Sequence, residues 1–151
     1  MKIFAIDPGT LQSAYILWNG KNVLEKGIVN NALLLETIIP SLEMNLSIIE
    51  MVASYGMPVG KEIFETVRWI GRFEERILTV GYSKKVELVY RREVKLHHCH
   101  SAKAKDANIR QALVDKYGKP GTKKNPGVTY GITKDMWSAF ALATYKMEGQ
   151  K

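Results

Sequence analysis

The chain has 151 residues, a length that suits one domain with a sizeable hydrophobic core. Its 46% hydrophobic content and mean hydropathy of −0.15 are typical of a globular protein in water. The apolar N-terminal stretch is too short for a signal peptide or a membrane span, and the single cysteine, Cys99, excludes an intramolecular disulfide framework. We therefore expect a protein of a reducing cytoplasm.

The charge of the chain is basic and unevenly distributed. The formal net charge is +7 and the pI is about 9.5. Residues 84–124 hold 12 Lys and Arg against 4 Asp and Glu, a net of +8, so the other 110 residues sum to −1. A charge run is often only a solvated face, but a segment that carries the entire excess favours a phosphate-binding surface, with nucleic acid as the commonest partner.

The first patterned stretch is residues 2–6, an apolar run that predicts a buried strand. It ends abruptly at Asp7, where a carboxylate is costly without a compensating charge. Pro8 cannot continue a sheet ladder, and Gly9 permits a tight turn. Asp7 is therefore either a turn residue that bonds its own backbone or an acid held rigidly for metal-dependent phosphoryl transfer.

Two further strands are expected next. Residues 13–18 alternate small and large apolar side chains, and Asn19-Gly20 is a strong hairpin signal because both turn positions need a positive φ. Residues 21–29 then form the third strand of an antiparallel meander. Asn30 and Asn31 are candidate N-caps for the helix that follows.

That short helix covers residues 32–39, and Pro40 is expected to end it. The apolar run at residues 45–53 follows a helix, which predicts a crossover strand parallel to the first. Glu50 interrupts this run and would lie near Asp7. Two carboxylates there repel each other unless a divalent cation lies between them, whereas the plainer alternative is a cross-strand salt bridge.

The longest helical pattern is residues 61–79, which follows a glycine- and proline-containing loop at residues 54–60. Trp69 and Phe73 on this helix suit core packing or a dimer interface. A further strand is expected at residues 86–90. It leads toward the run His97-His98-Cys99-His100.

The histidine and cysteine run invites a zinc interpretation. Structural zinc sites usually draw separated ligands from two segments, and four adjacent candidates do not converge easily on one tetrahedral ion. We therefore expect these side chains to line a DNA-facing surface or to pack locally.

A helix is predicted over residues 107–117, with Asp106 as its N-cap and Gly118 beyond its end. Lysines just before a helix N-terminus can bind a phosphate. Residues 118–131 form a lysine-bearing loop that either links mobile elements or orders on a nucleic-acid backbone. The residues expected to contact DNA are Lys103, Lys105, Arg110, Lys119, Lys123 and Lys124.

The last predicted helix covers residues 134–147 and is almost wholly apolar, which predicts packing against the sheet. Thr133 is a plausible N-cap. Asp135 falls in the first turn, where the helix dipole favours an acid. The alternative is that Asp135 supplies a third metal ligand next to the end of the first strand.

In this order, the features resemble a RuvC-type Holliday-junction resolvase of the compact kind found in phages and prophages. The resemblance is carried by AIDPGT at the first strand, the glutamate in LSIIE, a lysine-rich run before a helix, and a terminal KDMWSAFALA helix. It covers residues 3–145. It implies a single α/β ribonuclease-H-like domain over residues 1–151, with a mixed five-stranded sheet that is antiparallel over its first three strands, then parallel, and flanked by helices.

The resemblance also implies a homodimer that cuts opposed strands of four-way DNA junctions in recombination and repair, without a membrane or a small-molecule cofactor. Acids matching Asp7, Glu50 and Asp135 bind magnesium or manganese in that family, and we expect two ions in each centre. Bacterial members usually carry a further acid three residues into the last helix, where this chain has Ser138. Asp106, the serine with a water, or a reduced coordination shell would then replace it.

The chemistry suits these residues, because carboxylate-held cations activate a water and stabilise the leaving 3′ oxygen in an in-line displacement. No Cys/His or Ser/His pair at an interpretable spacing suggests a covalent nucleophile. The first alternative is another ribonuclease-H-like nuclease acting on simple branched DNA or an RNA–DNA hybrid. The second is a non-catalytic junction-binding protein, against which the intact acids argue. If a phage or prophage encodes the chain, the expected location is the cytoplasm of the bacterial host.

Overall fold

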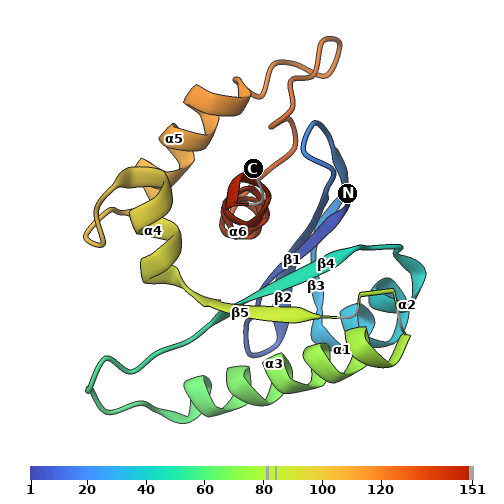
Figure 1. Ribbon diagram of the computed structural model, residues 1–151, viewed down its shortest axis with the longest axis vertical. Coiled ribbons are helices and arrows are strands. Elements are labelled where there is room, and N and C mark those ends of the chain that lie inside the picture. The colour runs from blue at the N-terminus through green and yellow to red at the C-terminus, as the bar shows by residue number, and fades with distance from the viewer. Residues whose placement is uncertain (81, 84, 150–151) are drawn as a thin grey trace.

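The computed structural model describes residues 1–80, 82–83 and 85–149, and its centre is a five-stranded sheet (Figure 1). The strands lie in the order β3-β2-β1-β4-β5. The pairs β1–β2 and β2–β3 are antiparallel, whereas β1–β4 and β4–β5 are parallel, which confirms the predicted mixed sheet. The strand bounds are β1 (Ile3–Asp7), β2 (Gln12–Trp18), β3 (Val23–Asn30), β4 (Leu46–Met51) and β5 (Val86–Tyr90).

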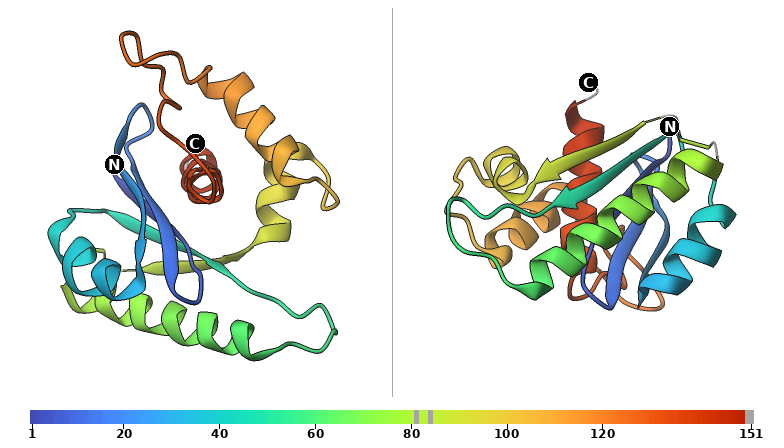
Figure 2. Two further views of the ribbon diagram at one scale, coloured as in Figure 1. Left: turned by 180° about the vertical axis from the view of Figure 1, so that it is seen from behind. Right: turned by 90° about the horizontal axis from the view of Figure 1, so that it is seen from below.

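Helices cover both faces of this sheet (Figure 2). One face carries the long helix α3 with three short helical segments, and the other carries α6 with α4 and α5 outside it. The helical bounds are α1 (Asn31–Leu33), the π-helical turn η1 (Leu34–Ile38), α2 (Ile39–Ser41), α3 (Lys61–Val80), α4 (Arg91–Cys99), α5 (Asp106–Tyr117) and α6 (Met136–Gly149). Within the described ranges, none of these helices is long and apolar enough to cross a bilayer.

The central strand β1 contributes side chains to both cores. Ile3 and Ala5 pack in the core under α6, while Phe4 and Ile6 pack in the core under α3, and all four are fully buried. A strand that is buried on both faces needs no polar alternation, which explains the continuous apolar run in the sequence. Asp7 is the first residue of the strand that is not fully covered.

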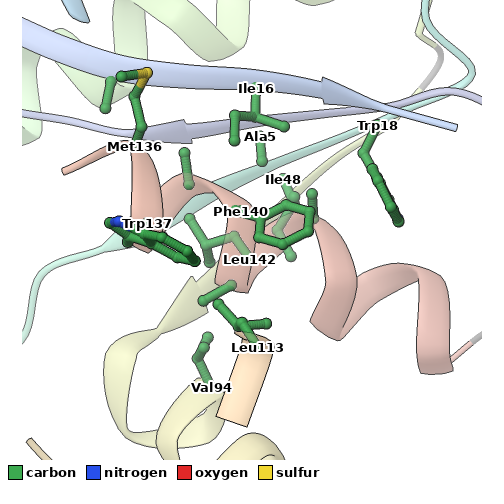
Figure 3. Close-up of a cluster of buried hydrophobic side chains, with 14 of the residues drawn as sticks. Ala5, Ile16, Trp18, Ile48, Val94, Leu113, Met136, Trp137, Phe140 and Leu142 are labelled. Carbon is green, nitrogen blue, oxygen red and sulfur yellow. The ribbon is translucent and has the colours of Figure 1, made fainter. Parts of the chain in front are cut away.

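The core on the α6 side joins the sheet to three helices (Figure 3). Phe140 of α6 lies against Trp18 of β2, with ring centroids 5.1 Å apart and an edge-on geometry. Val94 of α4 and Leu113 of α5 complete the cluster from the outer side. Because sheet and helices both contact it, α6 is buried almost all round, and its apolar sequence predicted this position.

The turn between β2 and β3 is wider than the predicted two-residue hairpin. Gly20 has a φ of +92°, but Asn19 does not adopt a positive φ. Instead, Oδ1 of Asn19 accepts hydrogen bonds from the backbone N–H groups of Lys21 and Asn22 at 2.9 and 2.6 Å. This side-chain turn delays the start of β3 to Val23.

The prediction that Pro40 ends the short helix is wrong. Asn30 caps its start as expected, since Oδ1 accepts from the N–H of Ala32 at 2.8 Å, but α2 continues one residue past Pro40. The preceding turn is π-helical, so the proline's missing N–H leaves the carbonyl of Leu35 free. Nε of Arg76 in α3 donates to that carbonyl at 3.2 Å and replaces the lost bond.

The structure confirms the long helix, as α3, and decides which of its aromatic residues are available to a partner. Phe73 is fully buried in the core with Ile70 and Ile77. Trp69 is only partly buried and stacks on Phe73 at 5.7 Å between ring centroids. Phe64 is exposed on the same helix, so the outer face of α3 keeps an apolar component.

Helix α4 follows β5 directly, and the sequence interpretation did not anticipate it. Tyr90 is the N-cap, and the carboxylate of Glu93 accepts from its backbone N–H at 3.0 Å, which satisfies one donor of the first turn. Val94 is the one fully buried residue in the helix, so the apolar periodicity is weak. The helix ends at His100, whose φ of +58° is left-handed.

Two helix starts also differ from expectation. Lys105, and not Asp106, is the N-cap of α5, and Asp106 is the first helical residue. The N-cap side chain itself accepts no capping hydrogen bond. Instead, the side chain of Asn108, three residues later, accepts from the backbone N–H of Lys105 at 2.9 Å. Helix α6 begins at Met136, so Asp135 lies in the turn just before it.

Candidate active site

The carboxyl ends of three parallel strands meet at one edge of the sheet. Ile6 of β1 pairs with Ile49 of β4, so the residues that follow, Asp7 and Glu50, are neighbours across the two strands. The last residue of β5 pairs with the last residue of β4, which places Arg91 at the same edge. Ligands of open α/β sheets bind outside the carboxyl ends of the strands.

A cavity of about 390 Å³ opens beside this edge. Its walls come from β4, α4, α5, α6 and the turn before α6. The charged and polar residues that line it are Glu50, Arg91, Asp106, Arg110, Lys134, Asp135 and Ser138. The structure therefore brings three of the four predicted acids around one cavity, and Asp7 lies next to one of them.

The acids differ in their exposure. Glu50 is buried, with 8% of its surface exposed, and Asp7 is half-buried, whereas Asp106 and Asp135 are exposed. Burial, together with the carboxylates of Glu50 and Asp135, raises the pKa of Asp7 to about 9. At neutral pH Asp7 therefore holds a proton, which it shares in a hydrogen bond with Glu50. Burial and the neighbouring carboxylates thus oppose the ionisation of Asp7, and the charge of Arg91 offsets only part of that effect.

Arg91 contacts this acidic group from the first turn of α4. Its Nη1 donates to Oε1 of Glu50 and to Oγ of Ser138, both at 3.3 Å, and its Nη2 donates to the carboxylate of Asp106. Burial alone would lower the pKa of Arg91, but the charges of Glu50 and Asp106 raise it above its usual value. The sequence interpretation missed this arginine, although its position directly after a parallel strand was a usable signal.

The acids at this edge fit a hard divalent cation. Carboxylate oxygens are the ligands that magnesium and manganese prefer, and here they come from β1, β4 and the turn before α6. The carboxylates of Asp7, Glu50 and Asp135 are nevertheless not drawn into a tight group. In the described part of the chain, the group whose ligand atoms all lie within 4.8 Å of one another is His97, His98 and Glu148.

That second cluster lies at the other end of α6 and is held by hydrogen bonds. Glu148 accepts from Nε2 of His97 at 3.2 Å, from the hydroxyl of Tyr117 at 2.6 Å and from Nζ of Lys116. Nε2 of His98 lies 2.9 Å from the carbonyl oxygen of Ala141, which makes that nitrogen the donor. His97 and His98 therefore pack locally and join α4, α5 and α6, which is one of the two alternatives that the sequence left open.

The predicted DNA-contacting residues fall at two places. Arg110 lines the cavity, and its guanidinium carbon lies 5.0 Å from the ring centroid of Trp137. Lys103 and Lys105 are exposed just before α5, next to Asp106. The remaining three are exposed beyond the far end of α5, which is about 18 Å long by the rise of 1.5 Å per residue. They are Lys119, Lys123 and Lys124.

One more basic residue at the cavity was not predicted. Lys134 lines it from the turn before α6, where its φ is +49°. A lysine in this left-handed conformation is uncommon, and the turn places it directly before the acid Asp135. Lys84, the first residue of the basic segment, lies outside the described residues.

The five-stranded mixed sheet flanked by helices is the predicted ribonuclease-H-like fold, and acids lie at the ends of its parallel strands. Comparison of the structure with solved structures makes this class more specific. Thermus thermophilus RuvC matches with a TM-score of 0.71 and 14% sequence identity, covering 99% of this chain and 97% of that one. T. thermophilus RuvC in complex with a Holliday junction substrate matches with the same TM-score and identity, covering 96% and 92%.

No protein-family model and no curated protein matches the chain. At 14% identity the likeness is one of fold, and it extends over nearly the whole of both chains. The chain therefore has the RuvC fold, as the motifs implied.

Proposed function

We propose that this protein is a Holliday-junction resolvase, a divalent-metal-dependent endonuclease that hydrolyses phosphodiester bonds in opposed strands of a four-way DNA junction. The observation that carries the proposal is the placement of Asp7 and Glu50 at one sheet edge of a chain with the RuvC fold, with Asp135 near enough for its charge to raise the pKa of Asp7. A solved neighbour bound to a Holliday junction substrate supports the choice of DNA structure.

In this proposal Asp7, Glu50 and Asp135 hold magnesium, and manganese substitutes for it. The bound cation supplies the activation of a water and the stabilisation of the leaving oxygen. Glu50 is buried on β4 and braced by Arg91, so its carboxylate is fixed before DNA binds. Asp7 holds a proton that a bound cation replaces. Asp135 is exposed beside the cavity, where the substrate phosphate approaches.

The basic residues divide the DNA backbone contacts between them. Lys103, Lys105 and Arg110 lie beside or in the cavity and would hold the phosphates nearest the scissile bond. The loop after α5 offers exposed lysines about one helix length away, which suits a second stretch of backbone. Phosphate contacts of this kind supply affinity and register but carry no sequence information.

Paired cutting of opposed strands needs two centres, so the proposal includes a homodimer. The outer face of α3 is the surface that suits it among the described elements. Phe64 is 63% exposed there, with Val67 and Leu78 at 37% and 42%. Sedimentation or light scattering of the wild type and of Phe64→Glu tests the proposed homodimer. A charge on the contact face should give a monomer.

The proposed activity is tested with labelled four-way junction, flap and RNA–DNA hybrid, each incubated with and without magnesium. The proposal predicts cleavage of the four-way junction far above that of the other two substrates, and only with the metal. Preferred cleavage of the hybrid would indicate a different ribonuclease-H-like nuclease. Tight junction binding without cleavage in magnesium or manganese would indicate a non-catalytic binding protein.

A further inference from the structure

We propose that the guanidinium of Arg91 is a built-in cation of the catalytic centre, which takes the place of a second metal ion, so that each chain binds one divalent ion. The inference deepens the proposed function and depends on it for its catalytic meaning. It is carried by the contacts of Arg91, by the charge of the acids around the cavity and by the residue at position 138.

Arg91 is anchored from three other elements of the fold. Its two terminal nitrogens contact Glu50 on β4, Ser138 on α6 and Asp106 at the start of α5, while its own backbone starts α4. Its side chain is 32% exposed and lines the cavity. A surface arginine that only solvates a helix start would not bridge β4, α5 and α6.

The charges around the cavity leave room for one divalent ion beside Arg91. The acids Asp7, Glu50, Asp106 and Asp135 carry four negative charges when all are ionised. Arg91, Arg110 and Lys134 line the same cavity and carry three positive charges, so one divalent ion brings the positive charge to five and a second ion brings it to seven. Since Arg91 pairs with Glu50 and Asp106, the two carboxylates that do not pair with it are those of Asp7 and Asp135, which remain for a cation together with the second oxygen of Glu50.

Ser138 supports the same assignment. Its hydroxyl accepts from Nη1 of Arg91 at 3.3 Å, so the α6 side of the cavity presents a neutral oxygen and a guanidinium. A second divalent ion bound there would lie against a fixed positive charge and would lack a carboxylate from α6. The neutral side chain of Ser138 and the charge of Arg91 therefore both disfavour a second divalent ion on this side of the cavity.

Arg91 would act directly on the substrate phosphate. A guanidinium has five N–H donors in a planar fork that matches phosphate oxygens, and its positive charge stabilises the charge that develops on them. In the hydrolysis, a water molecule loses a proton as its oxygen bonds to phosphorus, the bond from phosphorus to the 3′ oxygen breaks, and the 3′ oxygen takes up a proton. The products are a 5′-phosphate and a 3′-hydroxyl, and Arg91 contacts the non-bridging oxygens throughout.

Manganese titration of the metal-free protein by calorimetry tests the proposal without any need for cleavage. We expect the wild type to bind one Mn²⁺ per chain. Arg91→Gln should bind the first ion at least about tenfold more tightly, because a charge within hydrogen-bond distance of a ligand is removed, and should bind a second ion. Arg91→Lys keeps the charge and should bind one. Arg92→Gln is the matched control, since Arg92 is exposed and makes none of these contacts.

Two Mn²⁺ ions bound per wild-type chain would overturn the proposal, and this result does not depend on any variant being folded. Unchanged stoichiometry and affinity in a folded Arg91→Gln would equally overturn it and would leave Arg91 as a brace between elements. If the wild type binds one ion but cleaves no branched DNA, the proposed function fails while the assignment of Arg91 as a resident cation stands.

Discussion

Helix α6 has a charged cluster at each end, and the two clusters are built in opposite ways. At its start, Asp7, Glu50 and Asp135 gather at the sheet edge, and one of them keeps a proton because charge there is in excess. At its end, Glu148 accepts from three donors, one of them Lys116, and it is ionised. The first cluster is unsatisfied without a ligand, whereas the second is complete.

This difference is the one expected, on physical grounds, between a functional site and a structural one. Burial alone would raise the pKa of Glu148, but hydrogen bonds from Lys116, Tyr117 and His97 outweigh it and lower that pKa. No such set of donors surrounds Asp7 in the described structure, where burial and two acids raise the pKa together. Strongly perturbed groups that lack compensation concentrate at functional sites. We therefore expect changes at the first cluster to remove activity and changes at the second to remove stability.

The largest effect is expected from Asp7→Asn and Glu50→Gln. Each should reduce junction cleavage at least about 10³-fold, equal to about 4 kcal/mol of transition-state stabilisation, because a metal ligand is lost. Junction binding and the melting temperature should change little, since the amides are nearly isosteric. Single-turnover cleavage, gel-shift binding and thermal melts measure the three quantities. Near wild-type cleavage by either variant would remove that residue from the centre.

The next largest effect concerns DNA affinity and touches neither cluster. Neutralising Lys103, Lys105, Lys123 and Lys124 together should flatten the log–log dependence of binding on salt by about 3.6 units, since each phosphate contact contributes about 0.9 on duplex DNA. The variant should stay folded, because all four side chains are exposed. Binding measured between low and physiological salt tests this. An unchanged slope would place the DNA on a different face of the molecule.

A smaller effect, on stability, is expected from Glu148→Gln. The variant should lose about 1.5–3 kcal/mol of unfolding free energy at pH 7, the usual value for hydrogen bonds to a charged group. Urea unfolding at pH 7 measures it, and the exposed Glu75→Gln on α3 is the control. Cleavage per folded molecule should not change. A loss of cleavage with full stability would contradict the structural role of this cluster.

The same variant has a predicted pH dependence. The folded-state pKa of Glu148 lies below its ordinary value of 4.5, so its stabilisation is present above that pH and is lost as pH falls further. Burial lowers the pKa of His98 below 6.5, so the wild type begins to lose stability already as pH falls below 6.5. Glu148→Gln should keep the loss near pH 6 and lack the one below pH 4.5. If the unfolding free energies of both proteins fell identically below pH 4.5, the stabilising role of Glu148 would be contradicted.

The smallest effect is expected from Asp106→Ser. Serine suits a helix start, and Arg91 would keep its contacts to Glu50 and Ser138, so stability should change by less than about 1 kcal/mol. Cleavage should fall by no more than about tenfold, because Asp106 orients Arg91 from an exposed position. A collapse of activity without loss of stability would instead make Asp106 a metal ligand in place of the acid that is absent at Ser138.

The sequence predicted the acidic edge well because its signals were local. Asp7 and Glu50 each interrupt an apolar run, and the parallel pairing that joins them follows from a crossover connection. The mixed sheet and the long helices follow from the same periodicities. The order of these strands and helices along the chain determines how they pair, and the sequence shows that order directly.

The parts that were missed depend on contacts between segments far apart in the chain. Arg91 binds residues 41 and 47 positions away, and its position after a strand does not reveal these contacts. Helix α4 was hidden because one fully buried residue, Val94, leaves almost no apolar period. Asp106 matched an N-cap by sequence, yet its side chain pairs with Arg91 and the cap lies one residue earlier. Pro40 was misjudged because its lost bond is replaced from α3.

The most direct test of the account is to map the cuts on a four-way junction, each strand labelled in turn, in magnesium. The account predicts nicks at symmetry-related positions in two opposed strands, with 5′-phosphate and 3′-hydroxyl ends that a ligase reseals. Asp7→Asn should give none of these nicks while it still binds the junction. Cuts in a single strand, ends that cannot be ligated, or equal cutting without a divalent metal would contradict the claim that this chain is a metal-dependent junction resolvase.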